Sequence, residues 1–574
     1  MRDNTILHIP MSQFAHGIDE NTLVFRLRTS ANEVDECIFC YGDTACRSNP
    51  VDIYKIPMNK ALSDEEFDWY EVVIEKAIPR VCYCFELVKG DVVAYYYADK
   101  LYDDVTPERN ELYKLPFNRR EDIADAPDWL KKAVVYNIFP DSFASGYRSI
   151  TGQSGRALYG DIPCLGKNGG TISGIKANLD YIKEIGFNCI YLNPVFTAGE
   201  YHKYDLLDYY SIDPVFGSNE EFKSLVDTCH DLGIKVIIDG VFNHCGWKFF
   251  AFEDVVKNGS KSKYWDWFYG LKEPVIRPDN WDEIPDYTCF AYERLMPKLN
   301  TGNSAVQDYF CKVGAYWVRE YGIDGWRLDV ADEVNFDFWR AFRKSVKEVN
   351  PNTALIGEVW QTATSWLDGS IFDSCMNYDF LKCCKYYFAK NAMTVETFNQ
   401  AVNHMLMRYK KNLTCAQLNL LDSHDTPRFL SHCNGDISRL IMAVAFQMTF
   451  TGTPSVFYGD ENGFEGILED DYRQPMRFDL DCKVKDIYRQ LIKIRSSSEA
   501  FSKGEFHRII VDKERRIYAY ERYNDNDRFV VAINNSNAEV DYSLSGYKSK
   551  ELLFSQGVNG EKMAPYGVGV WRII

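Results

Sequence analysis

The chain has 574 residues, which is too many for one compact core and predicts roughly two to four domains. Acidic residues outnumber basic ones by 83 to 65, and the formal net charge of −18 argues against nucleic acid as a partner. The N-terminus lacks the apolar core of a signal peptide, and no run of about 18 apolar residues occurs, so we expect neither secretion nor a membrane span.

The 17 cysteines are scattered through apolar segments, as is typical of reduced thiols that pack as small hydrophobic side chains. Cys37 and Cys40 have a Cys-x-x-Cys spacing, and Cys383 is followed by Cys384. No second Cys or His pair stands at zinc-finger spacing. We therefore expect no metal or redox centre at these cysteines, and a cytoplasmic protein.

Short stretches of alternating apolar and polar residues run from residue 23 to about 102 and are separated by Gly, Asn and Asp turns. They predict an N-terminal β-sandwich, which we place at residues 1–125. The polar segment 103–128 contains Pro107, Pro116 and Pro127 and predicts a linker.

Between residues 126 and 500, apolar strand-like runs alternate with amphipathic helices, which indicates βα units and a parallel sheet. In one helix, Ser218 and Glu221 form a capping box, and Gly233 ends the helical pattern. Eight strand candidates predict an α/β fold with a closed (β/α)₈ TIM barrel. They are residues 134–139, 189–192, 235–239, 325–329, 354–358, 374–378, 416–421 and 455–458.

Two further segments complete the predicted organisation. Residues 243–300 are long for one βα loop and rich in Trp, Tyr and Asp, so we predict an inserted subdomain after strand 3, over the active-site face. Residues 501–574 return to short alternating strands and predict a C-terminal β-sandwich.

Four of the predicted barrel strands have polar or charged side chains at their C-terminal ends. In barrels of this kind, catalytic residues lie at the C-terminal ends of the strands. A single carboxylate at a strand end is often a loop cap, but a set at four ends predicts an active site. The residues are Asp239 and His244 after strand 3, Arg327 and Asp329 at strand 4, Glu358 and Trp360 at strand 5, and His424 and Asp425 at strand 7.

These segments resemble the four signature regions of the α-amylase superfamily of glycoside hydrolases, in the same order. They are Asp-Gly-Val-Phe-Asn-His at 239–244, Gly-Trp-Arg-Leu-Asp-Val-Ala-Asp-Glu at 325–333, Gly-Glu-Val-Trp at 357–360 and Leu-Asp-Ser-His-Asp-Thr-Pro-Arg at 421–428. Met-Pro-Lys-Leu-Asn-Thr at 296–301 is similar to the mark of the neopullulanase, cyclomaltodextrinase and maltogenic amylase subgroup. Segments 136–144, 202–205 and 452–461 also resemble that subgroup, so the resemblance spans nearly the full chain.

The resemblance implies a retaining hydrolase that cleaves α-1,4 and also α-1,6 glucosidic bonds in maltodextrins, cyclodextrins or pullulan. Asp329 would be the nucleophile that forms a covalent glycosyl-enzyme, and Glu358 would be the general acid and then the base. Arg327 lies two residues before Asp329 on one strand, so both side chains point the same way and the guanidinium would keep Asp329 ionised.

The same resemblance assigns residues to substrate binding. Asp425 would bind the hydroxyls of the reacting sugar, with His424 and His244 donating hydrogen bonds beside it. Tyr204 would stack its ring on the sugar, and Arg428 would hold Asp425 or the adjacent sugar. The implied ligand is an α-glucan oligosaccharide or a cyclodextrin, and the implied assembly is a homodimer in which the N-terminal domain of one chain covers the cleft of the other.

Two departures from the family pattern bear on cofactor and substrate. The loop after the first barrel strand reads Ala-Ser-Gly-Tyr-Arg-Ser-Ile-Thr at 144–151 and is poor in hard oxygen ligands, and Thr171 stands where the family often has a ligand Asp. No cofactor is therefore expected to be required, and the residues argue against calcium at this loop. Asp332 stands where many subgroup members have Asn, which leaves the preferred substrate open.

Three alternatives remain at this point. A transglycosylase or α-glucosidase of the same fold would differ in loop geometry around Trp360 and the inserted subdomain. A non-catalytic glucan-binding relative should have lost one of the carboxylates. A metal-dependent barrel hydrolase would use His244, Asp329, His424 and Asp425 as ligands and would be inactivated by a chelator.

Overall fold

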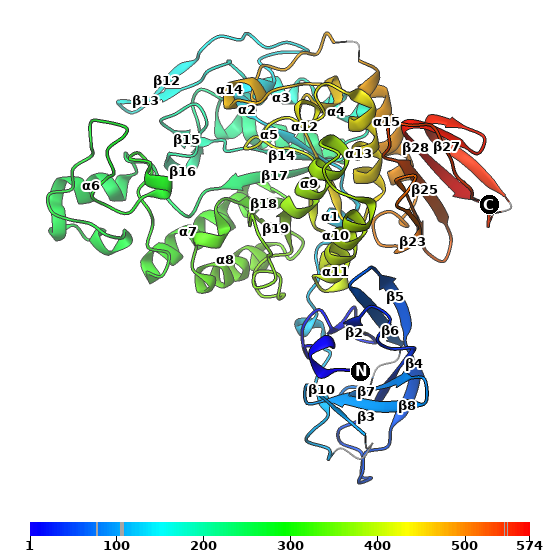
Figure 1. Cartoon of the computed structure of the whole chain (residues 1–574). Coiled ribbons are helices and arrows are strands. Elements are labelled where there is room, and N and C mark those ends of the chain that lie inside the picture. The colour runs from blue at the N-terminus through cyan, green and yellow to red at the C-terminus, as the bar shows by residue number, and fades with distance from the viewer. Residues whose placement is uncertain (76–77, 104–107, 481, 545, 548) are drawn as a thin grey trace.

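The computed structural model describes residues 1–75, 78–103, 108–480, 482–544, 546–547 and 549–574. An N-terminal β-domain lies at the foot of the molecule in Figure 1, the barrel lies above it, and a C-terminal β-sheet stands at the side of the barrel. Pro107, part of the predicted linker, falls outside the described residues.

The N-terminal domain consists of two antiparallel sheets that enclose a core of aromatic side chains. The rings of Phe25 and Phe39 lie 4.3 Å apart, and those of Phe25 and Tyr83 lie 4.7 Å apart. One sheet has the order β1 (Ala15–Gly17), β2 (Thr22–Ser30), β6 (Phe67–Glu75), β5 (Asn59–Ser63); the other has β4 (Tyr54–Pro57), β3 (Glu36–Asp43), β7 (Val81–Lys89), β8 (Val92–Tyr97), β9 (Lys100–Tyr102). The predicted β-sandwich is confirmed.

The linker prediction for residues 103–128 is wrong in part. Strand β10 (Tyr113–Leu115) pairs antiparallel with β7 and so belongs to the sandwich. The physical reason is that Leu112, Tyr113 and Leu115 bury their side chains in the domain core, although their neighbours in sequence are polar.

Eight parallel strands form the closed barrel, and each lies where the sequence predicts a strand. Hydrogen bonds between the last strand and the first close the sheet. All eight are almost entirely buried, because the barrel core lies on one face and helices cover the other. They are β11 (Val135–Ile138), β14 (Cys189–Leu192), β17 (Lys235–Gly240), β18 (Gly325–Leu328), β19 (Ala354–Gly357), β20 (Ser374–Asn377), β21 (Leu418–Leu420) and β22 (Thr453–Phe457).

The helices surround the barrel, and their ends follow local sequence rules. Helix α5 begins with the predicted capping box: the Glu221 amide donates to Ser218 Oγ, and the Ser218 amide donates to Glu221. The main outer helices are α4 (Leu179–Ile185), α5 (Asn219–Asp231), α7 (Ser304–Tyr316), α8 (Phe336–Val349), α9 (Tyr378–Cys384), α10 (Val395–Met407), α13 (Ile437–Thr449) and α15 (Lys483–Ser496).

Long loops cover the end of the barrel where the strands finish. The segment 243–300 contains helix α6 (Phe250–Asn258), and a bridge between His244 and Lys298 brings its two ends together. Two small hairpins lie beside it, β12 (Arg156–Tyr159) with β13 (Ile162–Leu165), and β15 (Phe196–Ala198) with β16 (Leu206–Ile212).

One antiparallel sheet forms the C-terminal domain, in the region where the alternating pattern predicts the strands of a β-sandwich. Side chains such as Tyr518 and Tyr520 join the barrel core, and the alternate residues Ile517 and Ala519 face a separate small core. The strands are β23 (Glu505–Asp512), β24 (Ile517–Tyr523), β25 (Arg528–Asn534), β26 (Val540–Asp541), β27 (Lys550–Asn559) and β28 (Lys562–Ile573).

A network of ion pairs joins the three domains. Glu71 of the N-terminal sheet lies 2.7 Å from Arg26 and 3.3 Å from Lys411, which follows helix α10 of the barrel. Lys411 also lies 2.7 Å from Glu505 of the C-terminal domain. Arg26 donates to the Tyr409 carbonyl at 3.1 Å, so the guanidinium itself crosses the junction.

We expect Glu71→Gln to lower the free energy of unfolding at pH 7 by about 3–5 kcal/mol, because Arg26 and Lys411 lose a shared, largely buried counter-charge. Burial alone would raise the pKa of Glu71, but Arg26 and Lys411 lower it from 4.5 to about 2. The folded-state pKa is depressed, so this stabilisation is present above pH 4.5 and is lost as the pH falls towards 2.

Urea unfolding at pH 7, and at several pH values between 4.5 and 2.5, measures both effects. The wild-type protein should lose more stability across that acid range than the variant does. Equal free energies of unfolding at pH 7 would contradict the assigned role of Glu71.

Candidate active site

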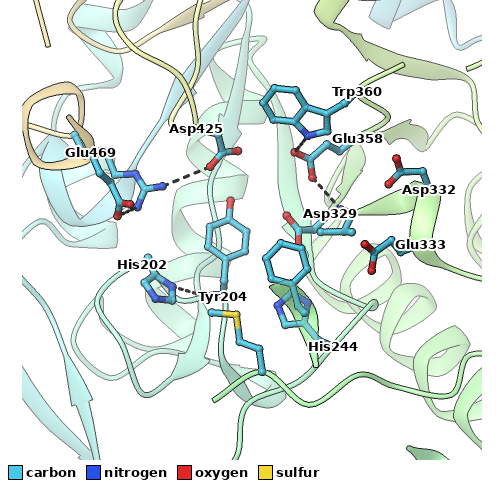
Figure 2. Close-up of a pocket in the computed structure, with 14 residues that line it drawn as sticks. His202, Tyr204, His244, Asp329, Asp332, Glu333, Glu358, Trp360, Asp425 and Glu469 are labelled. Atoms are coloured by element: carbon cyan, nitrogen blue, oxygen red, sulfur yellow. Dashed lines mark hydrogen bonds and ion pairs between the residues drawn. The ribbon is translucent and has the colours of Figure 1, made fainter. Parts of the chain in front are cut away.

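A cavity of about 540 Å³ opens at the strand ends of the barrel (Figure 2), and the inserted segment contributes Phe290 and Met296 to its lining. Six of the nine site residues predicted from the sequence line it, whereas Arg327 and His424 lie fully buried beside them. The lining residues are His202, Tyr204, His244, Phe290, Met296, Asp329, Val330, Asp332, Glu333, Glu358, Trp360, Asp425, Glu469 and Arg473.

Parallel strands bring the three carboxyl groups together, because Asp329, Glu358 and Asp425 each follow a barrel strand at the same end. The residue after Asp329, Val330, has φ 43°, a left-handed conformation that is costly for a β-branched side chain. In this conformation its amide donates to Glu358 Oε2 at 2.8 Å. The strained turn therefore fixes Asp329 and Glu358 relative to one another.

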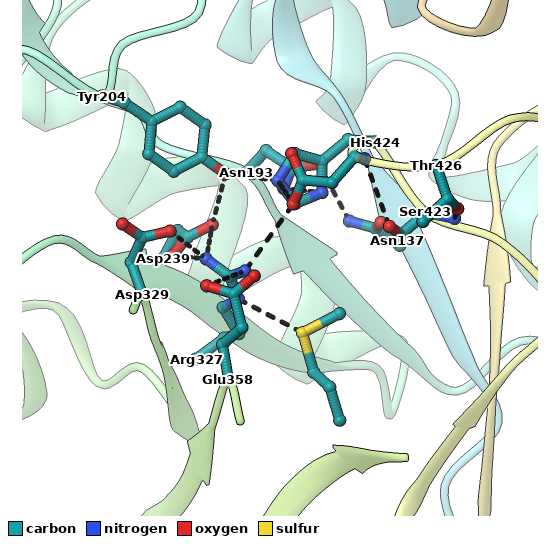
Figure 3. Close-up of polar contacts among 12 residues, drawn as sticks. Asn137, Asn193, Tyr204, Asp239, Arg327, Asp329, Glu358, Ser423, His424 and Thr426 are labelled. Carbon is teal, nitrogen blue, oxygen red and sulfur yellow. Dashed lines mark hydrogen bonds and ion pairs between the residues drawn. The ribbon is translucent and has the colours of Figure 1, made fainter. Parts of the chain in front are cut away.

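The guanidinium of Arg327 lies among the carboxyl groups of Asp239, Asp329 and Glu358 (Figure 3). Its guanidinium is fully buried and lies 2.7 Å from Asp329, 2.9 Å from Asp239 and 2.9 Å from Glu358. Asp425 is more distant, at 3.9 Å. One buried cation thus faces four carboxyl groups.

The pKa of Asp329 is raised well above the usual range of an aspartic acid. Burial is the largest cause; Arg327 opposes it, and the neighbouring charges of Glu358 and Asp239 raise the pKa further. Burial outweighs the effect of Arg327, so the expectation that the guanidinium keeps Asp329 ionised is not met in the free site.

Asp425 lies on the opposite side of the cavity and stays ionised. Its Oδ2 lies 2.9 Å from His424 Nε2, and Arg473 donates to its Oδ1 at 3.4 Å. Burial would raise the pKa of Asp425, but His424, Arg327 and Arg473 lower it below its usual range. An ionised carboxylate at this place can accept hydrogen bonds from sugar hydroxyls.

Tyr204 and Trp360 present aromatic rings to the cavity. The Tyr204 ring is parallel to that of His424 with centroids 5.8 Å apart, and its hydroxyl donates to Asp239 at 3.1 Å. Trp360 donates from Nε1 to Glu358 Oε1 at 3.0 Å and stacks on Tyr378 at 3.8 Å. The Trp360 side chain remains 48% exposed, so its free surface is available to a ligand.

His244 lines the cavity, but not beside Asp425 as the sequence reading predicts. Its ring stacks on Phe290 of the inserted segment, with centroids 4.9 Å apart. Burial lowers its pKa to about 3, so the ring is neutral at physiological pH. Nε2 is buried without a hydrogen-bond partner in the protein, and a sugar hydroxyl would satisfy it.

The prediction that Arg428 holds Asp425 or a sugar is wrong. Arg428 is fully buried outside the cavity, where it lies 2.8 Å from Asp460 and donates to the Tyr472 carbonyl. The chain turns into helix α12 (Phe429–His432) immediately after it, and this turn directs the side chain inward. Arg473, which the sequence reading missed, contacts Asp425 instead.

A signal for Arg473 is present in the sequence. It belongs to the loop that follows the eighth predicted strand, and loops in that position lie at the active-site end of a barrel. Arg473 also lies 2.5 Å from Glu469 and donates from Nε to the His424 carbonyl at 2.8 Å. It therefore ties this loop to the segment that carries Asp425.

The described residues also bear on metal binding and on membranes. They contain no group of three or more His, Cys, Asp or Glu side chains placed to hold a metal ion, so the four ligands of the metal-dependent alternative do not form a set. Within the same residues, none of the helices is long and apolar enough to cross a bilayer.

A closed (β/α)₈ barrel with buried carboxyl groups on one arginine, and an aromatic-lined cavity above them, defines a glycoside hydrolase. Residues 137–537 match the alpha amylase catalytic domain family, and residues 1–119 match the alpha amylase N-terminal ig-like domain. The chain belongs to the alpha-amylase family of glycoside hydrolases.

Individual relatives are similar over nearly the whole length. The chain is 38% identical to a cyclomaltodextrinase of Geobacillus thermopakistaniensis, over 95% of this chain and 93% of the relative. It is 37% identical to neopullulanase 2 of Thermoactinomyces vulgaris, over 92% of this chain and 90% of that one. A solved cyclomaltodextrinase structure superposes with a TM-score of 0.91 at 34% identity and covers both chains fully.

Proposed function

We propose that this chain is a retaining hydrolase of α-1,4 and α-1,6 glucosidic bonds in maltodextrins, cyclodextrins or pullulan. The observation that carries the proposal is the contact of one buried guanidinium, Arg327, with both Asp329 and Glu358. The names of the relatives, cyclomaltodextrinase and neopullulanase, support the substrate class.

In the first step, Asp329 attacks the anomeric carbon while Glu358 protonates the leaving oxygen, and a covalent glycosyl-enzyme forms. In the second step, Glu358 takes a proton from water, which attacks the same carbon and releases Asp329. Two inversions leave the α configuration unchanged. Asp425 and His244 hold the hydroxyls of the reacting sugar, and Tyr204 supports its apolar face.

Incubation with β-cyclodextrin, pullulan, maltotriose and starch tests the proposal. Proton NMR during the first minutes identifies the anomer that is released, and linkage analysis identifies which bonds were cut. Release of the β anomer would overturn the retaining mechanism, and no turnover of any of the four glucans would overturn the substrate class.

The exposed ring of Trp360 favours transglycosylation as a second activity. It contacts Glu358, which must deprotonate the acceptor in the second step. An aromatic surface in that place can hold an incoming sugar so that its hydroxyl competes with water. Oligosaccharides longer than the substrate should then accumulate at high maltotriose concentration, and their absence would contradict this activity.

We propose that no metal ion is required, although calcium is the one cofactor that the family pattern raises. Protein groups hold the loop 144–151: the Ser145 amide donates to the Ser149 carbonyl at 3.0 Å, and the Thr171 amide donates to the Ala144 carbonyl at 2.8 Å. Thr171 also caps helix α3 (Ile172–Lys176) through its hydroxyl. Its side chain is therefore used for folding.

Excess EDTA is expected to leave both kcat and Tm unchanged, because these hydrogen bonds already hold the loop 144–151 in place. Scanning calorimetry and the maltotriose assay, each with and without chelator, check this. A loss that added calcium restores, and added magnesium does not, would establish a calcium requirement.

The proposed assembly is a homodimer in which the N-terminal domain of one chain covers the cleft of its partner. Exposed apolar side chains on both parts support it: Tyr54 and Val92 on the N-terminal domain, and Ile276 and Trp281 on the inserted segment. Light scattering should give about twice the 66.5 kDa of one chain. Val92→Asp should shift that mass toward the monomer, whereas a monomeric wild-type protein would contradict the assembly.

We also propose a cytoplasmic location. All 17 cysteines lie among the described residues and are free thiols, and most of them are buried. Free thiols in this number suit a reducing compartment. Fractionation of the native source, followed by detection of the protein with an antibody, tests the location.

A further inference from the structure

Lys203 lies between two residues that line the cavity, His202 and Tyr204, but its side chain does not enter the cavity. It is fully buried, which is rare for a lysine. Its φ is 64°, in the left-handed region that a lysine seldom occupies. The chain thus accepts an unfavourable conformation at Lys203, whose side chain is buried, while its neighbours His202 and Tyr204 line the cavity, as Figure 2 shows for these two residues.

The ammonium group of Lys203 joins three segments of the barrel face. It lies 2.9 Å from Asp213, just beyond β16, and donates to the Leu165 carbonyl of β13 at 2.7 Å. The Phe216 ring lies 5.3 Å away and adds a cation–π contact. Asp213 is fully buried as well, and it also accepts from the Ala198 amide at 3.0 Å.

The opposite side of the loop is held by groups of the active site. The Tyr204 hydroxyl donates to Asp239 and contacts His424, and the Tyr204 amide donates to His202 Nδ1 at 3.0 Å. The Tyr204 hydroxyl is therefore held by Asp239 and His424, and the backbone next to Tyr204 is held by the buried Lys203. Without the ammonium, the loop would lose its links to the Leu165 carbonyl and the Asp213 carboxylate, and its contact with β13 would rest on the bond from the Leu165 amide to the Gly199 carbonyl.

We propose that Lys203 is a positioning residue for the reaction, holding Tyr204 and His202 at the cavity through its ion pair with Asp213. The proposal rests on the proposed function, since the ligand that Tyr204 and His202 meet is taken to be the α-glucan. The Leu165 carbonyl, the Asp213 carboxylate and the Phe216 ring surround the ammonium, and together they can bind an organic cation. A small alkylammonium ion should therefore fit the space that a truncated side chain leaves.

The test variant is Lys203→Gly. Glycine adopts φ 64° without strain, so this change removes the side chain and leaves the backbone conformation allowed. We expect kcat/KM for maltotriose to fall on the order of 10²-fold, since a displacement of about 1 Å in a group that positions the substrate has effects of this size. Propylammonium chloride should restore a large part of the loss, whereas propan-1-ol, which lacks the charge, should restore nothing.

A second readout does not depend on turnover. Hydrogen–deuterium exchange of residues 199–206 should be faster in Lys203→Gly than in the wild-type protein and should slow again with propylammonium. If the exchange follows this course while the wild-type protein cleaves none of the glucans tested, the proposed function fails and the positioning role stands. If the wild-type protein is active and the variant equals it in kcat/KM, the positioning role is overturned.

Two further variants complete the design. Lys131→Met removes another buried lysine, which lies 2.6 Å from Asp125 and away from the cavity; it should lose stability but keep kcat/KM. If Lys203→Gly does not fold, Lys203→Gly with Asp213→Asn removes the unpaired carboxylate. The double variant should fold and show a similar loss of kcat/KM, now without rescue by propylammonium. Equal rescue by propanol, or a folded double variant with wild-type kcat/KM, would overturn the proposal.

Discussion

Asp329→Asn is expected to reduce kcat on maltotriose and β-cyclodextrin on the order of 10⁴-fold or more, because an amide cannot attack the anomeric carbon. The substitution preserves shape, and Arg327 keeps Asp239 and Glu358 as partners, so the fold should persist. Initial rates and a thermal melt separate loss of chemistry from loss of structure.

The retaining mechanism makes a sharper prediction for Asp329→Ala. Azide can enter the space left by the carboxylate and attack the α-linked sugar from that side, which gives a glycosyl azide of inverted, β configuration. A matched control is Asp337→Asn, an exposed carboxylate at the start of helix α8 that should leave kcat unchanged. Undiminished turnover in Asp329→Asn would remove Asp329 from the role of nucleophile.

Most of the fold could be predicted from the sequence because it depends on burial. Barrel strands such as β14 and β19 are buried on both faces and read as continuous apolar runs, and helix α5 carries its capping box in local sequence. Strand β10 was not predicted because three residues within a polar stretch show no clear alternation of apolar and polar side chains. Its pairing with β7 is a tertiary contact.

The residues of the site also fall into those that local sequence places and those that tertiary contacts place. Residues at strand ends are placed by the strand itself, so Asp329 and Glu358 came together as expected. Arg428 and Arg473 show where local reasoning stops. Arg428 follows Asp425 by three residues but turns inward to Asp460, whereas the arginine that contacts Asp425 comes from 48 residues further along the chain. The position of Arg473 after the eighth strand marks its loop as part of the active-site end, but which of the two arginines contacts Asp425 depends on loop conformation.

Glu358→Gln should lower kcat on natural glucans on the order of 10³-fold, a loss in the range of 10²–10⁴ typical of general acid–base catalysis. The single amide oxygen of glutamine can replace only one of the two carboxylate oxygens that accept from Trp360 Nε1 and the Val330 amide, but the side chain keeps its size and shape, so oligosaccharide binding should be retained. Isothermal titration with maltotriose, beside the rate measurement, separates binding from turnover.

The two steps of the reaction need Glu358 differently, and this allows a decisive test. With α-maltosyl fluoride the leaving group departs without protonation, so Asp329 should still be glycosylated in the Gln variant. Hydrolysis of the ester then lacks its base, and the glycosyl-enzyme should accumulate as a mass increase of one maltosyl group on the peptide that contains Asp329. Azide, which needs no base, should release it as the α-maltosyl azide. A variant that turns over the fluoride at the wild-type rate, or that carries the sugar on another residue, would contradict the assignment of Glu358 and Asp329.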